Sequence, residues 1–345
     1  MVQRTLTTEY QVLPTIDKVL EWKNLQVAWR QVESNKGAPG VDEVSVARWG
    51  RNWETNLHRL RQQVKSNTYC PSRPRRFTVL KNDGGFRELS ILTVTDRVLQ
   101  RATLNALEPL FERRFLNCSF GYRPNRSVAH AVTTVVRQRE RGQRWVLDAD
   151  IRQCFESLDH QLIMELMRQE VKDAGLLRLN ALWLETGKAQ NPKVQNPKTQ
   201  NPKRQISSSD DGDHQPSATR SGHPPRGVPL GAVLSPLWCN LVLHELDAAL
   251  TRAGWILARY ADDFVVLAET EGRALTAWEE TEYALDGLGL QLNEAKTRVA
   301  SFDDGFTFLG VTFKGDEYSY IHEQKRIRVK GPTVKILHSY LPDFY

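Results

Sequence analysis

Two groups of aspartates lie in stretches that otherwise favour β-strands. Asp148 and Asp150 alternate with apolar residues over residues 145–151, so in a strand both carboxylates would share one face of the sheet. Asp262 and Asp263 interrupt a second apolar stretch, at a position that suits a hairpin tip. Carboxylates at the ends of apolar strands are costly unless a cation or a metal ion pairs with them. Two or three of them converging on divalent ions would form the protein part of a two-metal phosphoryl-transfer site, although adjacent aspartates are also common in exposed turns.

The elements that would position these aspartates follow from the spacing of apolar residues. Apolar side chains at steps of three and four predict helices, whereas β-branched and apolar runs predict strands. The expected helices cover residues 46–64, 94–115, 158–171, 237–250 and 274–288, with one more after Ser127, and the expected strands cover residues 145–151, both arms of 256–268, and 306–313. Asn82-Asp83-Gly84-Gly85 separates two β-prone runs and predicts a hairpin. Helices mixed with hairpin-connected strands, without regular βαβ alternation, predict an α+β fold.

Composition sets the broad class of the protein. The 345 residues suggest about two lobes or one large domain, and 40% hydrophobic with 26% charged residues is typical of a globular chain. The longest apolar run covers only residues 264–268, so no membrane span is expected. The first residues lack the apolar core of a secretory signal. The four cysteines form no C-x-x-C pair, which argues against a zinc knuckle or disulfide scaffold and predicts a cytoplasmic protein.

Charge is unevenly distributed along the chain. Residues 1–147 contain 25 Lys and Arg against 13 Asp and Glu, a net charge of +12, so the overall +6 leaves −6 for residues 148–345. This asymmetry is typical of a protein that holds a polyanion with one part and cations with the other. A solvated surface of uneven charge is the alternative.

Residues 188–225 differ from the rest of the chain. Lys188, Lys193, Lys198 and Lys203 recur every five residues, and Gln-Asn-Pro follows each of the first three. Proline at this spacing prevents a helix, and few large apolar side chains are present to form a core. We expect a disordered insertion here, with a basic nucleic-acid tether as the alternative.

A series of motifs follows in the order of a known family. Phe155 lies five residues beyond Asp150, and the later motifs are Gly227-Val228-Pro229-Leu230-Gly231, Tyr260-Ala261-Asp262-Asp263, residues 289–297, and Phe308-Leu309-Gly310-Val311. Together they resemble the palm of reverse transcriptases. Upstream, residues 36–42 and 120–127 resemble the bacterial group II intron branch of that family. The resemblance covers roughly residues 25 to 315. It implies a right-hand polymerase with fingers, and a palm built on an antiparallel sheet.

The resemblance also implies roles for the residues with suitable chemistry. Asp150 and Asp262 would bind two Mg²⁺ ions, for which Mn²⁺ could substitute. The backbone carbonyl of Ile151 would be a further ligand, and Asp263 is a less certain one. Lys296 would neutralise or protonate the departing pyrophosphate.

Further residues would recognise the nucleotide. Phe155 would lie beneath the sugar and exclude a 2′-hydroxyl, unless it is an ordinary core aromatic. Lys81 and Arg87 would hold the triphosphate. Leu230 and Gly231 would lie near the nascent base pair, where the family usually has Gln-Gly, so fidelity or nucleotide preference could differ.

Two further motifs concern the triphosphate and the primer. Glu88 follows Arg87, and would bring negative charge near the triphosphate unless it points away. Phe308-Leu309-Gly310 would form the primer grip, since glycine permits close approach of the backbone.

The resemblance divides the chain into expected parts. Fingers would occupy residues 1–143 and the palm residues 144–187 and 226–315, with the insertion between them. Residues 316–345 would be a basic tail that is at most a partial thumb, so the thumb would be minimal or absent, or a protein partner would supply it.

The function that follows is that of an RNA-directed DNA polymerase. It would extend the 3′-hydroxyl of a DNA or RNA primer with deoxynucleoside triphosphates (dNTPs) on an RNA template. The short tail resembles stand-alone enzymes of bacterial defence or CRISPR adaptation, which can work with an integrase partner. A maturase-type splicing cofactor that binds intron RNA, or a degenerate intron remnant, is the alternative.

Overall fold

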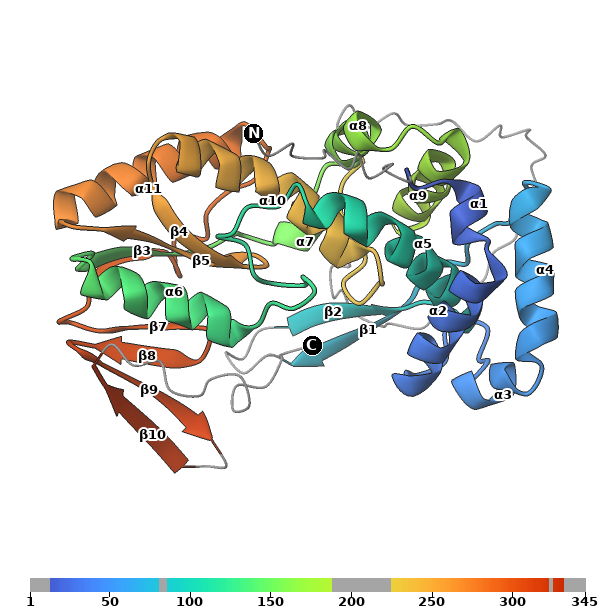
Figure 1. Cartoon of the computed structure of the whole chain (residues 1–345), viewed down its shortest axis with the longest axis horizontal. Helices are drawn as coiled ribbons and strands as arrows, with labels where there is room; N and C mark the ends of the chain where they lie inside the picture. Colours follow the sequence, from blue (N-terminus) through green and yellow to red (C-terminus); the bar gives the residue numbers. More distant parts are fainter. Residues whose placement is uncertain (1–12, 81–85, 188–224, 323–324, 332–345) are drawn as a thin grey trace, which may run out of the picture.

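The computed structural model describes residues 13–80, 86–187, 225–322 and 325–331. Helices and two antiparallel sheets of four strands dominate it, together with a separate hairpin (Figure 1). This mixture confirms the predicted α+β class. Lys81 and almost the whole predicted insertion, residues 188–225, lie outside the described residues. None of the described helices is both long and apolar enough to cross a bilayer.

The central sheet carries the aspartates. Its order is β4 (Ile256–Tyr260), β5 (Asp263–Ala268), β3 (Trp145–Asp150) and β6 (Arg298–Ser301), with neighbours antiparallel. The register pairs Asp150 with Asp263 and Tyr260 with Asp263. The strand that carries Asp148 and Asp150 therefore lies beside the Asp262-Asp263 hairpin.

Each face of the central sheet is covered. Leu147 and Ala149 of β3 join a buried cluster with residues of α10 (Ser235–Arg252) and α11 (Glu271–Asp286). Val146, on the opposite face, packs in a second cluster with α6 (Val128–Glu140). Since side chains alternate along a strand, Asp148 and Asp150 share the face of Val146. The strand therefore buries its apolar residues and ends in carboxylates.

The second sheet has the order β10 (Lys325–Lys330), β9 (Glu317–His322), β8 (Val311–Lys314) and β7 (Phe306–Phe308). Its strands follow one another in the chain and lie below α6 in Figure 1. The single strand predicted over residues 306–313 is wrong, because Leu309 and Gly310 both have positive φ, at 51° and 74°, and reverse the chain between β7 and β8.

A helical region forms the other end of the molecule, around α1 (Ile16–Val19), α2 (Trp22–Ser34), α3 (Val46–Gly50), α4 (Trp53–Lys65) and α5 (Val94–Glu112) (Figure 1). The helix predicted over residues 46–64 is divided, because the chain leaves helical geometry at Asn52 (φ −127°). The predicted hairpin is present as β1 (Arg75–Leu80) and β2 (Phe86–Ile91). Between the ends lie α7 (Cys154–Ser157), α8 (His160–Glu170) and α9 (Ala174–Gly187).

Candidate active site

The tip of the β4–β5 hairpin places Asp262 at the end of the central sheet. The last register pair joins Tyr260 to Asp263, so Ala261 and Asp262 form the turn. Ala261 is buried and has a φ of 60°, in the left-handed region that non-glycine residues seldom adopt. A hydrogen bond fixes this turn, because Nη1 of Arg259 donates to the Ala261 carbonyl at 2.9 Å.

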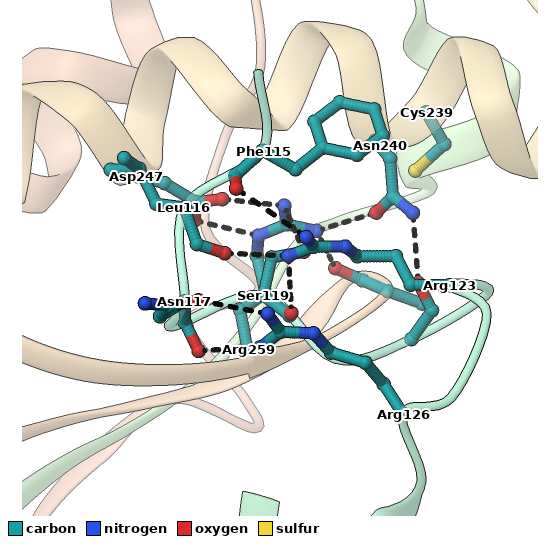
Figure 2. Close-up of polar contacts among 12 residues, drawn as sticks. Phe115, Leu116, Asn117, Ser119, Arg123, Arg126, Cys239, Asn240, Asp247 and Arg259 are labelled. Carbon is teal, nitrogen blue, oxygen red and sulfur yellow. Dashed lines mark hydrogen bonds and ion pairs between the residues drawn. The ribbon is translucent and has the colours of Figure 1, made fainter. Parts of the chain in front are cut away.

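Arg259 is fully buried and anchors the hairpin to α10 (Figure 2). Its Nε and Nη2 donate to the two carboxylate oxygens of Asp247, at 2.7 and 2.6 Å. Nη1 also donates to Asn240 Oδ1 at 3.0 Å, and Nη2 to Ser119 Oγ at 2.9 Å. Burial lowers the pKa of Arg259, but the Asp247 carboxylate outweighs it and raises the pKa overall. The guanidinium is therefore charged, has a hydrogen-bond acceptor for every N–H group, and connects α10 to the turn that carries Asp262.

The same network holds the segment that precedes the motif of residues 120–127. The Arg259 amide donates to the Cys118 carbonyl, and the Arg259 carbonyl accepts from the Phe120 amide, both at 2.8 Å. Asn240 Nδ2 donates to the Gly121 carbonyl at 2.8 Å. A Cβ on Gly121 would lie 2.5 Å from the Ala261 nitrogen, so only glycine lets this segment pack against the turn. The motif thus abuts the backbone of the Asp262 hairpin.

Asn293 orients the carboxylate of Asp150. Its Nδ2 donates to Asp150 Oδ2 at 2.9 Å, and its amide donates to the Asp150 carbonyl at 2.8 Å. The Arg152 amide in turn donates to the Gln291 carbonyl at 2.8 Å. These bonds fix the backbone on both sides of Ile151, whose carbonyl the resemblance assigns to a metal.

Sequence reasoning gave no role to Asn293, Arg259 or Asp247. The signal for Arg259 was present, because a charged residue inside an apolar β-stretch needs a buried partner. No local pattern identifies that partner, because Asp247 lies on another element. Asn293 was quoted within a motif, but its bond to Asp150 joins residues 143 positions apart.

Electrostatics at the sheet end favour a bound cation. Burial raises the pKa of Asp263 to about 7, with repulsion from Asp148, Asp262 and Asp150 adding to it and Lys296 opposing it. Burial also raises the pKa of Asp262, and the charge of Asp150 contributes, whereas the Arg87 guanidinium opposes the shift. A divalent cation between these carboxylates would relieve both the repulsion and the lost hydration.

The carboxylate oxygens of Asp150 and Asp262 suit Mg²⁺ that is bound together with a nucleotide. In the described part of the chain, no group of three His, Cys, Asp or Glu side chains is arranged to hold a metal unaided. Mg²⁺ is usually bound by one or two carboxylates together with substrate phosphates, and only seldom by a cage made wholly of protein. Asp150 and Asp262 provide hard oxygen donors of this kind, so the residues fit a metal that arrives with a nucleotide.

One cavity of about 200 Å³ brings together six of the thirteen predicted site residues. It is lined by Phe86, Arg87, Asp150, Arg152, Gln153, Cys154, Phe155, Glu156, Leu230, Asp262, Asn293 and Lys296. Carboxylates, two predicted phosphate-binding cations and the predicted sugar gate therefore meet in one place. Ile151, Asp263, Gly231 and residues 308–310 are not among its lining residues.

Phe155 and Leu230 also line a second cavity, of about 470 Å³. Phe155 is 6% exposed and begins a short helix, with its carbonyl accepting from the Val228 amide at 2.8 Å. The Leu230 carbonyl accepts from the Ser90 amide at 2.8 Å, which ties the turn to β2. Gly231 has a φ of 101°, and a Cβ there would lie 2.8 Å from the Ser90 carbonyl oxygen, so glycine is required.

The positions of the Glu88 and Phe308 side chains bear on two of the predictions. Glu88 pairs with Arg76 at 3.0 Å and does not line the cavity that Arg87 lines, so its charge points away from the site. Phe308 is 1% exposed and packs in the second core cluster. Its ring is therefore a core residue, and only Leu309 and Gly310 present backbone at the turn.

Comparison with known proteins agrees with these motifs. The family model described as "Reverse transcriptase (RNA-dependent DNA polymerase)" matches residues 79–313. Protein YkfC of Escherichia coli K12 is 33% identical, over 84% of this chain and 79% of its own length. The group II intron-encoded protein LtrA of Lactococcus lactis is 32% identical, over 64% of this chain but only 32% of its own length. This chain therefore spans about a third of LtrA.

Solved structures give only a distant likeness. A partial Cas6-RT-Cas1–Cas2 complex matches 78% of this chain and 42% of that chain, with 18% identity and a TM-score of 0.41. Family membership rests instead on the sequence matches. The chain belongs to the reverse transcriptase (RNA-dependent DNA polymerase) family, within which it is a group II intron-like RNA-directed DNA polymerase.

Proposed function

We propose that the 200 Å³ cavity binds a dNTP with two Mg²⁺ ions and adds it to a primer 3′-hydroxyl on an RNA template. One observation carries this proposal. Asp150 ends β3 and Asp262 lies in the β4–β5 turn, yet they line one cavity with Lys296, Arg87 and Phe155. Oxygen ligands, cations for phosphates and a ring beside the sugar are the groups that nucleotidyl transfer needs.

Each residue would have a distinct part in the reaction. The primer 3′-oxygen attacks the α-phosphorus, its proton is lost, and the bond to pyrophosphate breaks. Bound Mg²⁺ would lower the pKa of the attacking hydroxyl and offset charge on the leaving group. Asp150, oriented by Asn293, and Asp262, fixed by the Arg259 network, would hold the ions. Arg87 would bind the triphosphate, and Lys296 would neutralise or protonate the pyrophosphate.

The ring of Phe155 would select the sugar. Phe155 forms part of the wall of both cavities. It has little freedom to move, because its carbonyl accepts a hydrogen bond from the Val228 amide and its side chain is buried. A 2′-hydroxyl on the incoming sugar would collide with such a wall. Ile151, Asp263, Lys81, Leu230, Gly231 and the primer grip at 308–310 keep the roles that the resemblance implies.

The proposal includes the assignment of the parts. The sheet β4-β5-β3-β6 would be the palm, and β1, β2 and the N-terminal helices the fingers. Asp316 to Lys330, expected within a basic tail, contain β9 and β10 and extend the second sheet. A thumb or integrase function supplied by a partner belongs to the same proposal. So does a cytoplasmic location, which the four free thiols support.

Replacement of one metal ligand tests the proposal. Asp262→Asn keeps the size of the side chain but removes its charge, so extension of a primer on an RNA template with dNTPs and Mg²⁺ should be lost. Binding of the primer–template should change little, because the cations remain. Asp303→Asn, at a side chain that is 75% exposed on the β6–β7 loop, is the matched control and should extend normally. Extension by Asp262→Asn at the wild-type rate would refute the assignment.

A further inference from the structure

The second sheet has two chemically different faces. Phe306, Phe313, Tyr318 and Tyr320 are buried, and they join the cluster that packs against α6. Side chains alternate along each strand, so the residues between them point the other way, onto the outer face. Burial of the aromatic face explains why this sheet packs against α6. It does not explain which residues occupy the outer face.

Hydroxyl and cationic side chains make up most of the outer face. The register aligns Thr307 with Thr312, Thr312 with Ser319, and Ser319 with Arg328, which forms one row across all four strands. Thr307 Oγ1 and Thr312 Oγ1 lie 3.0 Å apart. Arg326 lies two residues before Arg328 on the same face, and is exposed. The row thus begins on β7, just before the turn at residues 309–310, and ends at the arginines of β10.

The balance of charge on this face is strongly positive. Lys314, Arg326, Arg328 and Lys330 are exposed there, whereas Glu317 is its single carboxylate among the described residues. None of the four cations forms an ion pair with another described residue. Glu317 lies opposite Lys314 and Lys330 in the register, whereas Arg326 and Arg328 lie opposite Ile321 and Ser319, so the two arginines have no carboxylate opposite them. Hydroxyls, lysines and arginines are the side chains that contact the phosphates and sugars of nucleic acids.

We propose that this outer face binds the sugar–phosphate backbone of the primer–template duplex as it leaves the active site. The inference rests on the proposed function, because Leu309 and Gly310 of the same sheet would contact the primer end. Strands lie about 4.8 Å apart, so β7 and β10 are separated by roughly 14 Å. At about 3.4 Å per base pair, the cations of β10 would meet the duplex some four pairs from the primer terminus.

The test removes the charges of β10 and measures binding to duplexes of different length. The variant is Arg326→Gln/Arg328→Gln/Lys330→Gln, at exposed positions where substitution should cost little stability. The control is Arg48→Gln/Arg51→Gln/Lys65→Gln. It removes the same charge from exposed positions on or beside α3 and α4, at the opposite end of the molecule (Figure 1). Each protein is titrated with a primer–template of 12 base pairs and one of 3 base pairs, carrying the same single-stranded overhang, from 50 to 200 mM salt.

The expected result is specific to duplex length. Each lost phosphate contact lowers the salt slope by about 0.9, so three contacts account for about 40-fold of affinity over this range of salt. The β10 variant should lose that salt dependence on the 12-pair duplex, while the 3-pair duplex and the control variant behave as wild type. Equal slopes for the β10 variant and the control would overturn the inference, as would equal losses on both duplexes. Aggregation of the β10 variant with unchanged binding would also overturn it, because the cations would then only protect an edge strand.

This outcome is separable from failure of the proposed function. Binding is measured without dNTPs, so it does not depend on catalysis. A wild-type protein that extends primers, combined with a β10 variant that binds like wild type, would reject only the outer face as a contact surface. A wild-type protein that neither binds nor extends a primed RNA template would reject the proposed function itself.

Discussion

Phe155 lines both the cavity that contains the carboxylates and the larger cavity of about 470 Å³. We predict that Phe155→Ala raises the ratio of ribonucleotide to deoxynucleotide incorporation by about tenfold or more, because the space of the ring becomes available to a 2′-hydroxyl. The ratio is measured by primer extension with each triphosphate in turn. Phe155→Tyr retains the ring and should keep the wild-type ratio. An unchanged ratio in Phe155→Ala would make this residue part of the core alone.

Asp263 makes stability depend on pH when no metal is bound. Burial, with repulsion from Asp148, Asp262 and Asp150, raises the pKa of its carboxyl from 3.8 to about 7 in the folded state. Between about pH 4 and pH 7 the folded state therefore holds a proton that the unfolded state has lost. Its contribution to stability is fully present below pH 4, and disappears as the pH rises through 7.

Thermal unfolding in the presence of a chelator checks this dependence. We predict that the Tm of the wild type falls between pH 5 and pH 7.5 by more than that of Asp263→Asn, whose side chain does not titrate. Addition of Mg²⁺ together with a dNTP at pH 7.5 should raise the Tm of the wild type, because the ion that arrives with the nucleotide stabilises the charged carboxylates. Parallel Tm curves for the two proteins would mean that Asp263 ionises normally.

Arg259 connects elements that are far apart in the chain. It links the catalytic hairpin to α10 and to the segment before residues 120–127. Asp247→Asn would leave its buried charge without a counterion, which typically costs about 3–5 kcal/mol of folding free energy. We predict a clear fall in Tm and a loss of extension in this variant.

A double variant separates stability from positioning. Arg259→Met/Asp247→Leu replaces the buried ion pair with apolar groups of similar size, a change that is often neutral or stabilising. Its Tm should therefore recover, whereas extension should remain low because the Ala261 carbonyl has lost its donor. Recovery of both would show that the pair serves folding only, and that the turn needs no support from Arg259.

Most single elements were predictable because their signals are local. Alternating apolar residues predicted β3, and an apolar run interrupted by Asp262-Asp263 predicted the β4–β5 hairpin. The cap at Ser127 predicted α6, where Ser127 and His130 form a capping box. The failures arose where one residue overrides a pattern. Leu309 takes a left-handed conformation inside an apolar run and divides the expected strand. Neither the leucine side chain nor the residues that precede Leu309 predict a positive φ at this position.

The way the elements combine was predictable only through family resemblance. Order along the chain identified Asp150, Asp262, Phe155 and Lys296, and the structure brings these four to one cavity. The contacts that hold them could not be derived, since Asn293 bonds Asp150 and Asp247 bonds Arg259 across loops or between elements. Such contacts depend on the packed fold, and a single sequence carries no record of which residues meet.

At the scale of the whole molecule, the net positive charge and the net negative charge lie in different parts of the chain. Most of the net charge of +12 over residues 1–147 comes from residues 113–147, which contain eight arginines and one glutamate, whereas the candidate metal-binding carboxylates lie in the second part of the chain. β10 is an exception, because it carries cations beyond the carboxylates.

Single-turnover extension of a DNA primer on an RNA template tests the central claim most directly. Wild type, Asp150→Asn and Asp303→Asn are each bound to the same primed RNA, and then mixed with dNTPs and Mg²⁺. We predict that wild type and Asp303→Asn elongate the primer. Asp150→Asn should bind the primed RNA equally well but elongate it at least about 100-fold more slowly. This is the usual cost of losing one group that stabilises the transition state. Elongation by Asp150→Asn at the wild-type rate would contradict the account.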